Sequence, residues 1–385
     1  MLRKLLGHIG RTRVERQDEH VIISNYNRHK NGRMDKRALL CYLTAPVVAD
    51  LAGETINRFS NSGIALSWVQ VLNEMGYAVD IIEWNDTNFT PQKTYDLVVF
   101  HGGHNFARIS QHLRAQPKII HFLTGSYWRF NNDKEDERRA DFKKRHGADT
   151  PRDRYIAVSE DPVNEAADGI IVLGNPSMRD TYPSHYKKVI TINNASYPDK
   201  HFSKNKKDYA SARKNFLFFA GSGNIHKGLD LLIDAFQNLD EHLYIVTVLD
   251  KPVMKALKKE LTRPNIHLAG EIPMRTAPFY DVIDKCAFVI APSCSEGQAG
   301  AVVECMNQGL IPIVSKETRL DAREYGRILR TNTISEIQRV VRGLGKRPAA
   351  DIEVMAQHTR RVALREHSPK HFRQQLNRAI NSILG

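Results

Sequence analysis

The chain has 385 residues, of which 41% are hydrophobic and 26% are charged, and its formal net charge is +13. This length exceeds what one ordinary core requires, so we expect two folded domains, and the composition excludes a disordered chain. No apolar run reaches the roughly 18 residues that span a bilayer, and the start of the chain does not have the pattern of a secretory signal. We therefore expect a cytoplasmic protein. Its charge suits phosphorylated ligands, an anionic membrane surface or nucleic acid.

Residues 1–37 hold ten Lys and Arg against four Asp and Glu and are predicted to form a basic N-terminal tail. Four apolar side chains between Leu2 and Ile9 would share one face of a short helix beside Arg3 and Lys4. Such a helix suits a peripheral position on the anionic inner face of a membrane. A frayed end, or a helix packed on its own domain, fits the same pattern.

Beyond the tail, short β-rich runs alternate with helical patterns. In the first half, strands are expected at residues 38–45, 77–84, 96–103, 118–125, 168–175 and 189–194, with a helix at 62–76. Residues 204–214 are polar and basic, which is a linker composition. In the second half, strands are expected at residues 216–221, 243–249, 265–270, 286–293 and 310–316, with a helix at 229–236.

This alternation predicts an α/β protein with parallel sheets covered by helices on both faces. We predict two doubly wound, Rossmann-like domains at residues 38–203 and 215–350. Residues 351–385 are expected to form helices that cross back to the first domain. Open parallel sheets bind ligands at the carboxyl ends of their strands, so the site should lie in the cleft where the two domains face each other.

The cysteines show no pattern of metal binding. Cys41, Cys286, Cys294 and Cys305 form no CxxC pair and have no histidines at zinc spacing. We expect buried, reduced thiols. Neither a metal site nor a cofactor is predicted.

The strongest chemical signal is the segment APSCSEGQAGAVVECMNQGLIPIVS at residues 291–315. A strand should end near Pro292, and a helix should follow. Backbone N–H groups at a helix start favour phosphate, and small residues let a diphosphate approach them closely. Glu296 precedes the helix and Glu304 lies inside it, so each carboxylate can accept hydrogen bonds from hydroxyls on one side of the phosphates. The expected phosphate-binding N–H groups are those of Ala299, Gly300 and Ala301.

A second signal is FAGSGNIHKGLDLLIDAF at residues 219–236. A strand runs into a loop of small residues and then into a helix. Lys227, just before that helix, supplies a mobile positive charge for a diphosphate. The small residues of the loop that we expect near the same group are Gly221, Ser222 and Gly223.

Together these segments resemble the retaining glycosyltransferases of the GT-B fold that carry a Glu-x7-Glu motif, the group 1 or family 4 type. Bacterial enzymes of surface polysaccharide synthesis are the nearest subgroup. The resemblance implies that Glu296 contacts the donor sugar and Glu304 the ribose. Ala299 stands where the family usually has Gly, and Ser222 stands at the Arg of its G-R-x4-K-G pattern. One phosphate cation of that pattern is therefore missing. Ser222 could still donate a hydrogen bond, and Arg275 or another base could supply the charge.

The resemblance also implies further donor contacts. The loop after the strand at 265–270, including Ile272, would meet the nucleobase. In the first domain, Gly63 would approach the diphosphate. Many relatives carry a histidine after the strand at 118–125, where this chain has Leu123 with Thr124 beside it. The histidines that could act instead are His101, His104 and His121, although a lone histidine is more often structural.

The implied reaction transfers a sugar from a nucleoside diphosphate sugar, with uracil or guanine as base, to an acceptor hydroxyl with retention and without metal. The acceptor would be a carbohydrate or a lipid-linked molecule. The charged residues 125–154 would face it, or would form a solvated helix hairpin. A nucleotide-sugar epimerase of the same fold, a basic binding protein and a non-catalytic scaffold are the alternatives. No module for specific nucleic-acid recognition is present.

Overall fold

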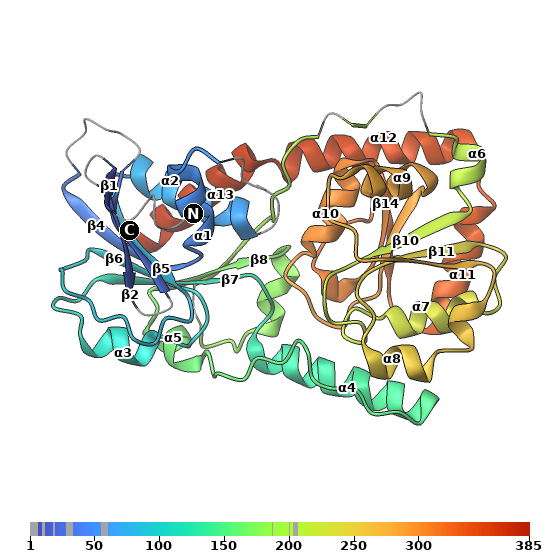
Figure 1. Ribbon diagram of the computed structural model, residues 1–385, viewed down its shortest axis with the longest axis horizontal. Helices are drawn as coiled ribbons and strands as arrows, with labels where there is room; N and C mark the ends of the chain where they lie inside the picture. The colour runs from blue at the N-terminus through green and yellow to red at the C-terminus, as the bar shows by residue number, and fades with distance from the viewer. Residues whose placement is uncertain are drawn as a thin grey trace.

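The computed structural model describes residues 7–9, 12–17, 20–27, 34–54, 61–186, 188–199, 201–202 and 207–385 (Figure 1). Within these ranges, two α/β domains lie side by side along the long axis of the molecule. The sheet of the first domain has the strand order β1-β2-β3-β5-β4-β6-β7-β8-β9, and that of the second has β12-β11-β10-β13-β14-β15. The predicted α/β class with parallel sheets is confirmed, apart from antiparallel strands at one edge of the first sheet.

The parallel strands of the first domain are buried apolar runs, as a sheet covered on both faces requires. Its core includes Trp68, which packs edge-on against Phe122 with ring centroids 5.1 Å apart. The strands are β4 (Lys36–Tyr42), β5 (Tyr77–Glu83), β6 (Leu97–Phe100), β7 (Lys118–Leu123), β8 (Gly169–Leu173) and β9 (Val189–Ile192). The helices are α1 (Ala45–Leu51), α2 (Asn61–Glu74), α3 (Phe106–Gln111), α4 (Trp128–His146) and α5 (Asp161–Ala166), with a 3-10 turn η2 (Pro176–Thr181).

The prediction of a basic tail is wrong for the described part of residues 1–37. These residues form β1 (Gly7–Ile9), β2 (Thr12–Gln17) and β3 (His20–Tyr26), which extend the sheet in antiparallel fashion beside β5. Val14 pairs with Ile23, and both are buried in the core. Besides its many charges, this segment has apolar and polar residues in alternation, and this two-residue period is typical of a strand. The predicted amphipathic helix falls partly on β1 and otherwise outside the described residues.

The second domain repeats the alternation of strand and helix. Its strands are β10 (Asn215–Phe219), β11 (His242–Val246), β12 (Ile266–Gly270), β13 (Phe288–Ala291), β14 (Ile311–Ser315) and β15 (Arg327–Leu329), all parallel. Its helices are α6 (Tyr209–Ala212), α7 (Leu229–Phe236), α8 (Lys251–Ala256), α9 (Ala277–Lys285), α10 (Gly300–Asn307) and α11 (Ile334–Gly345), with 3-10 turns η3 (Glu260–Thr262) and η4 (Lys316–Thr318). The linker prediction fails at α6, because Tyr209 and Ala212 are buried in this domain's core.

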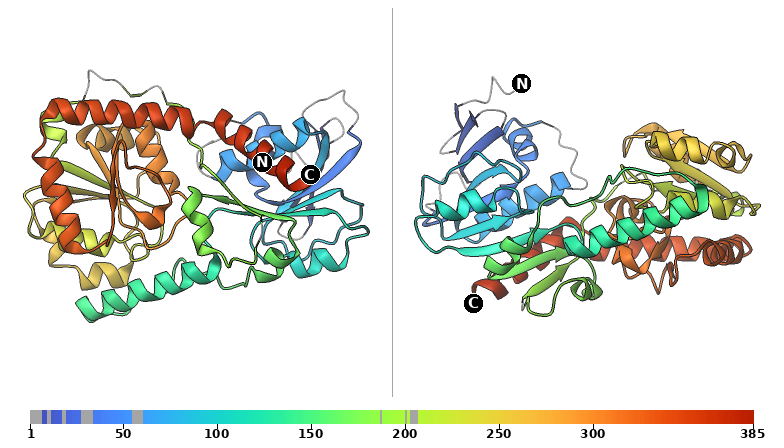
Figure 2. Two further views of the ribbon diagram at one scale, coloured as in Figure 1. Left: turned by 180° about the vertical axis from the view of Figure 1, so that it is seen from behind. Right: turned by 90° about the horizontal axis from the view of Figure 1, so that it is seen from below.

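Helices connect the domains along two opposite edges of the molecule (Figures 1 and 2). At one edge, α12 (Ala349–Glu366) lies against α10, and α13 (Pro369–Leu384) returns to α2, where Phe372 and Ile380 join the first core. At the other edge, α4 leaves the first domain and places Phe142 in the core of the second. The charged segment is therefore neither a hairpin nor wholly solvated. No helix in the described ranges is long and apolar enough to cross a bilayer.

Candidate functional site

A cavity of about 370 Å³ lies between the domains, where the loops after β10 and β13 meet the loop after β7. We name it the Glu296–Glu304 cavity after its two acidic residues. It brings together most of the residues predicted as donor contacts: Thr124, Gly221, Ser222, Lys227, Glu296, Ala299, Gly300, Ala301 and Glu304. The carboxyl ends of the strands thus form this site, as the topology of open parallel sheets predicts.

Glu296 and Lys227 form an ion pair at one end of this cavity. Lys227 is held there by the next residue, Gly228, which has φ +76° and caps α7. A Cβ on Gly228 would lie 2.9 Å from Pro292 Cγ and still closer to its carbonyl oxygen, so only glycine lets this turn rest on the end of β13. Burial raises the pKa of Glu296, but the positive charges around it, Lys227 foremost, outweigh burial and keep the pKa below its usual value. Glu296 is therefore a carboxylate at neutral pH.

Glu304 lies one turn inside α10 and is 1% exposed. Its carboxylate accepts hydrogen bonds from Ser196 Oγ at 2.6 Å and from Arg275 Nε at 2.8 Å. Ser196 follows the last strand of the first domain, so this contact also joins the domains. Arg275 is therefore bound to Glu304, and it does not line the cavity. It does not replace the cation missing at Ser222.

The start of α10 leaves backbone donors toward the cavity. The first hydrogen bonds of this helix run from the N–H groups of Val302 and Val303 to the carbonyl oxygen of Ala299. The three preceding N–H groups, those of Ala299, Gly300 and Ala301, come before this ladder, as at every helix start. These donors and the positive end of the helix dipole suit an anion.

A second cavity of about 490 Å³, which we name the histidine cavity, adjoins the first and is lined by His101, His104 and Trp84. His101 Nδ1–H donates to the carbonyl oxygen of Phe122 at 2.9 Å, which leaves Nε2 as an acceptor. Burial lowers the pKa of His101 to about 4, so the ring is neutral at neutral pH. His104 packs edge-on against Trp84 with centroids 4.7 Å apart.

The third histidine, His121, has a structural role. It is fully buried on β7, and its Nδ1–H donates to Asn164 Oδ1 at 2.8 Å. Burial lowers its pKa to about 3. It lines neither of the two cavities.

The two domains touch where the two cavities meet. Thr124, Arg154, Glu296 and Gly297 line both cavities. A Cβ on Gly297 would lie 2.6 Å from the carbonyl carbon of Thr124, so the glycine permits direct contact between the two loops. The next residue, Gln298, accepts a hydrogen bond from the N–H of Asn194 at 2.7 Å, across the same interface. The structure is therefore closed at this junction.

Three of the predicted donor contacts, Gly63, Ile272 and Gly223, do not line the Glu296–Glu304 cavity. Gly63 is buried within α2, and Asn61 is the residue of that helix that lines the Glu296–Glu304 cavity. Ile272 and Met274 both pack on the core of the second domain, and of the two Met274 lines the cavity. Gly223 lies just outside the lining. In each case the loop was identified, but the residue that faces the cavity depends on how the loop turns.

Other residues of the site were missed in the sequence. His226 precedes Lys227, is 2% exposed, and donates from Nε2–H to the carbonyl oxygen of Ser295 at 2.6 Å. Its position next to Lys227, in the loop of the second motif at residues 219–236, could have identified it from the sequence. Trp84 and Arg154 carried no such signal, because each follows an element without any motif.

No three His, Cys, Asp or Glu side chains among the described residues are grouped closely enough to hold a metal ion. The four cysteines are free and buried. Independence of metal stays a prediction.

Comparisons with known proteins bear on this geometry. Residues 213–343 match the family described as Glycosyl transferases group 1. This segment runs from just before β10 into α11, and it contains Lys227, Glu296 and Glu304. No curated protein sequence matches the chain significantly.

The chain is similar in structure to sucrose-phosphate synthase from Thermosynechococcus elongatus, with a TM-score of 0.61 and 11% identity over 91% of this chain and 99% of that chain. S. aureus TarM gives a TM-score of 0.54 at 13% identity, over 97% of this chain and 75% of that chain. HepE from Anabaena, in complex with UDP and glucose, gives 0.51 at 13% identity, over 90% and 99%. At such identities the likeness shows the two-domain fold. With the family match, it supports a glycosyltransferase of the GT-B type.

Proposed function

We propose that this chain is a retaining glycosyltransferase that moves a sugar from a nucleoside diphosphate sugar to an acceptor hydroxyl. One observation carries the proposal: two cavities between the domains meet at Glu296 and Thr124. A donor in the Glu296–Glu304 cavity and an acceptor in the histidine cavity would bring their reacting atoms together at this junction. Such proximity converts a reaction between two molecules into one within a single complex.

The Glu296–Glu304 cavity offers the groups that a nucleoside diphosphate sugar needs. Negative charge grows on the diphosphate as it leaves, and both Lys227 and the N–H groups at the start of α10 would stabilise it. Glu296 would accept hydrogen bonds from the donor sugar, and Glu304 from the ribose. UDP is the first nucleotide to test, because the similar structures of HepE and TarM were obtained with UDP.

Retention is proposed to proceed by attack from the side of the leaving group. Both carboxylates of the cavity are engaged by cations, Glu296 by Lys227 and Glu304 by Arg275. This pairing favours hydrogen bonding over a role as covalent nucleophile. The leaving diphosphate oxygen would take the proton of the acceptor hydroxyl, and the cations in the cavity would do the work of a metal.

The histidine cavity is proposed to hold a carbohydrate acceptor, free or lipid-linked. The rings of Trp84 and Tyr155 line it and offer apolar faces for a sugar. Neutral His101 would accept a hydrogen bond at Nε2 from a sugar hydroxyl. The proposed setting is polysaccharide or glycolipid synthesis in the cytoplasm, including the inner face of the membrane.

A thermal shift experiment tests the donor site. Wild type, Glu304→Ala and the exposed control Glu324→Ala are each mixed with UDP-, GDP-, ADP- and CMP-sugars. A ligand at about 100 times its Kd adds roughly 2.7 kcal/mol of stability. We expect one nucleotide family to stabilise the wild type and the control, and to stabilise Glu304→Ala much less. Folded wild type that responds to none of them would favour the non-catalytic scaffold.

Product analysis by NMR tests the reaction. We expect the stabilising donor to yield a glycoside with the anomeric configuration of the donor, at a rate that a chelator leaves unchanged. An isomerised nucleotide sugar without any acceptor would identify an epimerase instead. An inverted product would refute retention, and loss of activity with the chelator would refute independence of metal.

A further inference from the structure

The loop between β10 and α7 brings a single cation, Lys227, to the lining of the Glu296–Glu304 cavity. Ser222 stands where the resemblance places an arginine, which leaves Lys227 as the cation of this loop in the cavity. Lys227 is already paired with Glu296. Arg275, the other base considered for this role, is bound to Glu304 and lies outside the lining. A second cation for a diphosphate in this cavity would therefore come from another part of the fold.

Arg154 lines both cavities beside Lys227 and Glu296. Its side chain crosses the small-residue loop so closely that a Cβ on Gly223 would lie 2.8 Å from Arg154 Cγ. Gly223 also has φ +96°, a conformation that favours glycine. The Arg154 side chain makes no hydrogen bond or ion pair with the described residues, whereas its charge helps to lower the pKa of Glu296. A cation is thus placed against the loop and left without an ion-pair partner.

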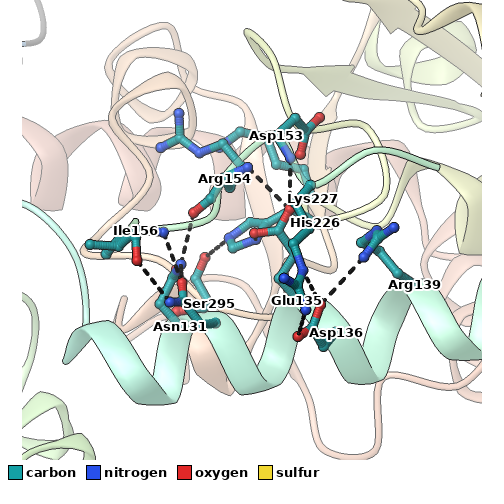
Figure 3. Close-up of polar contacts among 12 residues, drawn as sticks. Asn131, Glu135, Asp136, Arg139, Asp153, Arg154, Ile156, His226, Lys227 and Ser295 are labelled. Atoms are coloured by element: carbon teal, nitrogen blue, oxygen red, sulfur yellow. Dashed lines mark hydrogen bonds and ion pairs between the residues drawn. The ribbon is translucent and has the colours of Figure 1, made fainter. Parts of the chain in front are cut away.

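Side chains of α4 fix the backbone of Arg154, as the close-up with α4 beneath Arg154 shows (Figure 3). Glu135 Oε1 accepts hydrogen bonds from the N–H groups of Asp153 at 3.0 Å and Arg154 at 3.1 Å. Asn131 Nδ2 donates to the carbonyl oxygen of Arg154 at 2.9 Å. Glu135 is 1% exposed, so burial protects these contacts from water. These contacts fix the backbone of the loop, and the Arg154 side chain lines both cavities.

Helix α4 itself is anchored on the second domain. Phe142 is buried in that domain's core, and Arg145 forms ion pairs with Asp230 and Asp234 of α7. Arg138 donates from Nη2 to the carbonyl oxygen of Pro292 at 3.2 Å. Arg154 comes from the first half of the chain, but it is thereby fixed to the domain that carries Lys227.

We propose that Arg154 binds the donor diphosphate and supplies the phosphate cation that the loop lacks at Ser222. The inference rests on the proposed function, because it names the residue that completes the donor site. An arginine at this place can form two parallel hydrogen bonds to phosphate oxygens, which a lone lysine cannot. Arg154, which is distant in sequence, would thus supply the positive charge that the family pattern places at Ser222.

Isothermal titration with UDP and with uridine tests this role, since the two ligands differ by the diphosphate. Wild type, Arg154→Gln and the control Arg152→Gln are compared. Arg152 lies in the same loop, pairs with Asp136 and lines neither cavity. We expect Arg154→Gln to weaken the binding of UDP about 10- to 100-fold and to leave the binding of uridine unchanged. Arg152→Gln should change the affinity for neither ligand. Adding Ser222→Arg to Arg154→Gln should restore most of the lost affinity.

Each other result refutes the inference. If Arg154→Gln binds UDP as tightly as wild type does, Arg154 does not hold the diphosphate, while the donor site itself stands. Equal weakening of UDP and uridine would show a general disturbance of the loop. A raised KM for the acceptor with an unchanged Kd for UDP would assign Arg154 to the acceptor. If wild type binds none of UDP, GDP and ADP, the proposed function fails, and this inference fails with it.

Discussion

Replacing Gly297 by alanine tests whether the contact between the domains is needed for catalysis. The added Cβ would lie 2.6 Å from the carbonyl carbon of Thr124 and 2.8 Å from the N atom of Gly125, and closer still to the Thr124 oxygen. All three are backbone atoms of the opposite domain, so no side chain can rotate away. The clash is relieved most readily if the domains separate at this junction.

The expected magnitude follows from the cost of overpacking, which is typically about 1–3 kcal/mol. If the whole cost falls on the closed form, the equilibrium constant between closed and open forms drops about 5- to 150-fold. Because Lys227 and Glu304 both belong to the second domain, UDP binding should change far less than kcat. Transfer rates and UDP titration measure the two effects, and a melting curve shows that Gly297→Ala is folded.

Gly125→Ala is the matched control. Gly125 lies on the other side of the same contact, and a Cβ there meets nothing within 4 Å. We expect it to keep the wild-type UDP affinity and melting curve, so any clash effect is specific to Gly297. A wild-type kcat for Gly297→Ala would refute the reasoning, and so would UDP affinity that falls as much as kcat.

Two further predictions concern the supports of the site. Phe142→Ala removes a fully buried ring from the core of the second domain and should cost about 3–5 kcal/mol in urea unfolding, against almost nothing for the exposed Lys144→Ala. A loss under about 1 kcal/mol would mean that α4 is not anchored there. Burial lowers the pKa of His226 to about 4, so the unfolded chain binds more protons between pH 6.5 and 4, and stability falls as the pH falls through this window. His226→Gln should remove part of that slope, up to about 1.4 kcal/mol per pH unit, and an unchanged slope would contradict the assignment.

The parallel strands of the two sheets and the acid pair of the Glu296–Glu304 cavity were predictable because their signals are local. Glu296, the start of α10 and Glu304 follow one another within a single strand, loop and helix. Lys227 follows another strand end in the same way. In a parallel sheet the carboxyl ends of the strands lie side by side, so periodicity and spacing were sufficient to predict that these residues lie close together.

The edge of the first sheet was not predictable from composition. Ten basic residues in the first 37 suggested a basic tail, whereas Val14 and Ile23 are buried partners on β2 and β3. A strand needs only one apolar face, and the outer face can carry any number of charges. The count of charges therefore said little about whether the segment folds.

The sequence alone therefore established the layers, the strand ends and the acid pair, since each depends on residues close together in the chain. Only the tertiary structure decided which histidines line a cavity and that Arg275 is bound to Glu304. It also brought Arg154 to the Glu296–Glu304 cavity, through a helix whose anchor, Phe142, lies in the other domain's core. That arrangement depends on the packing of segments far apart in sequence, and no local period or spacing records such packing.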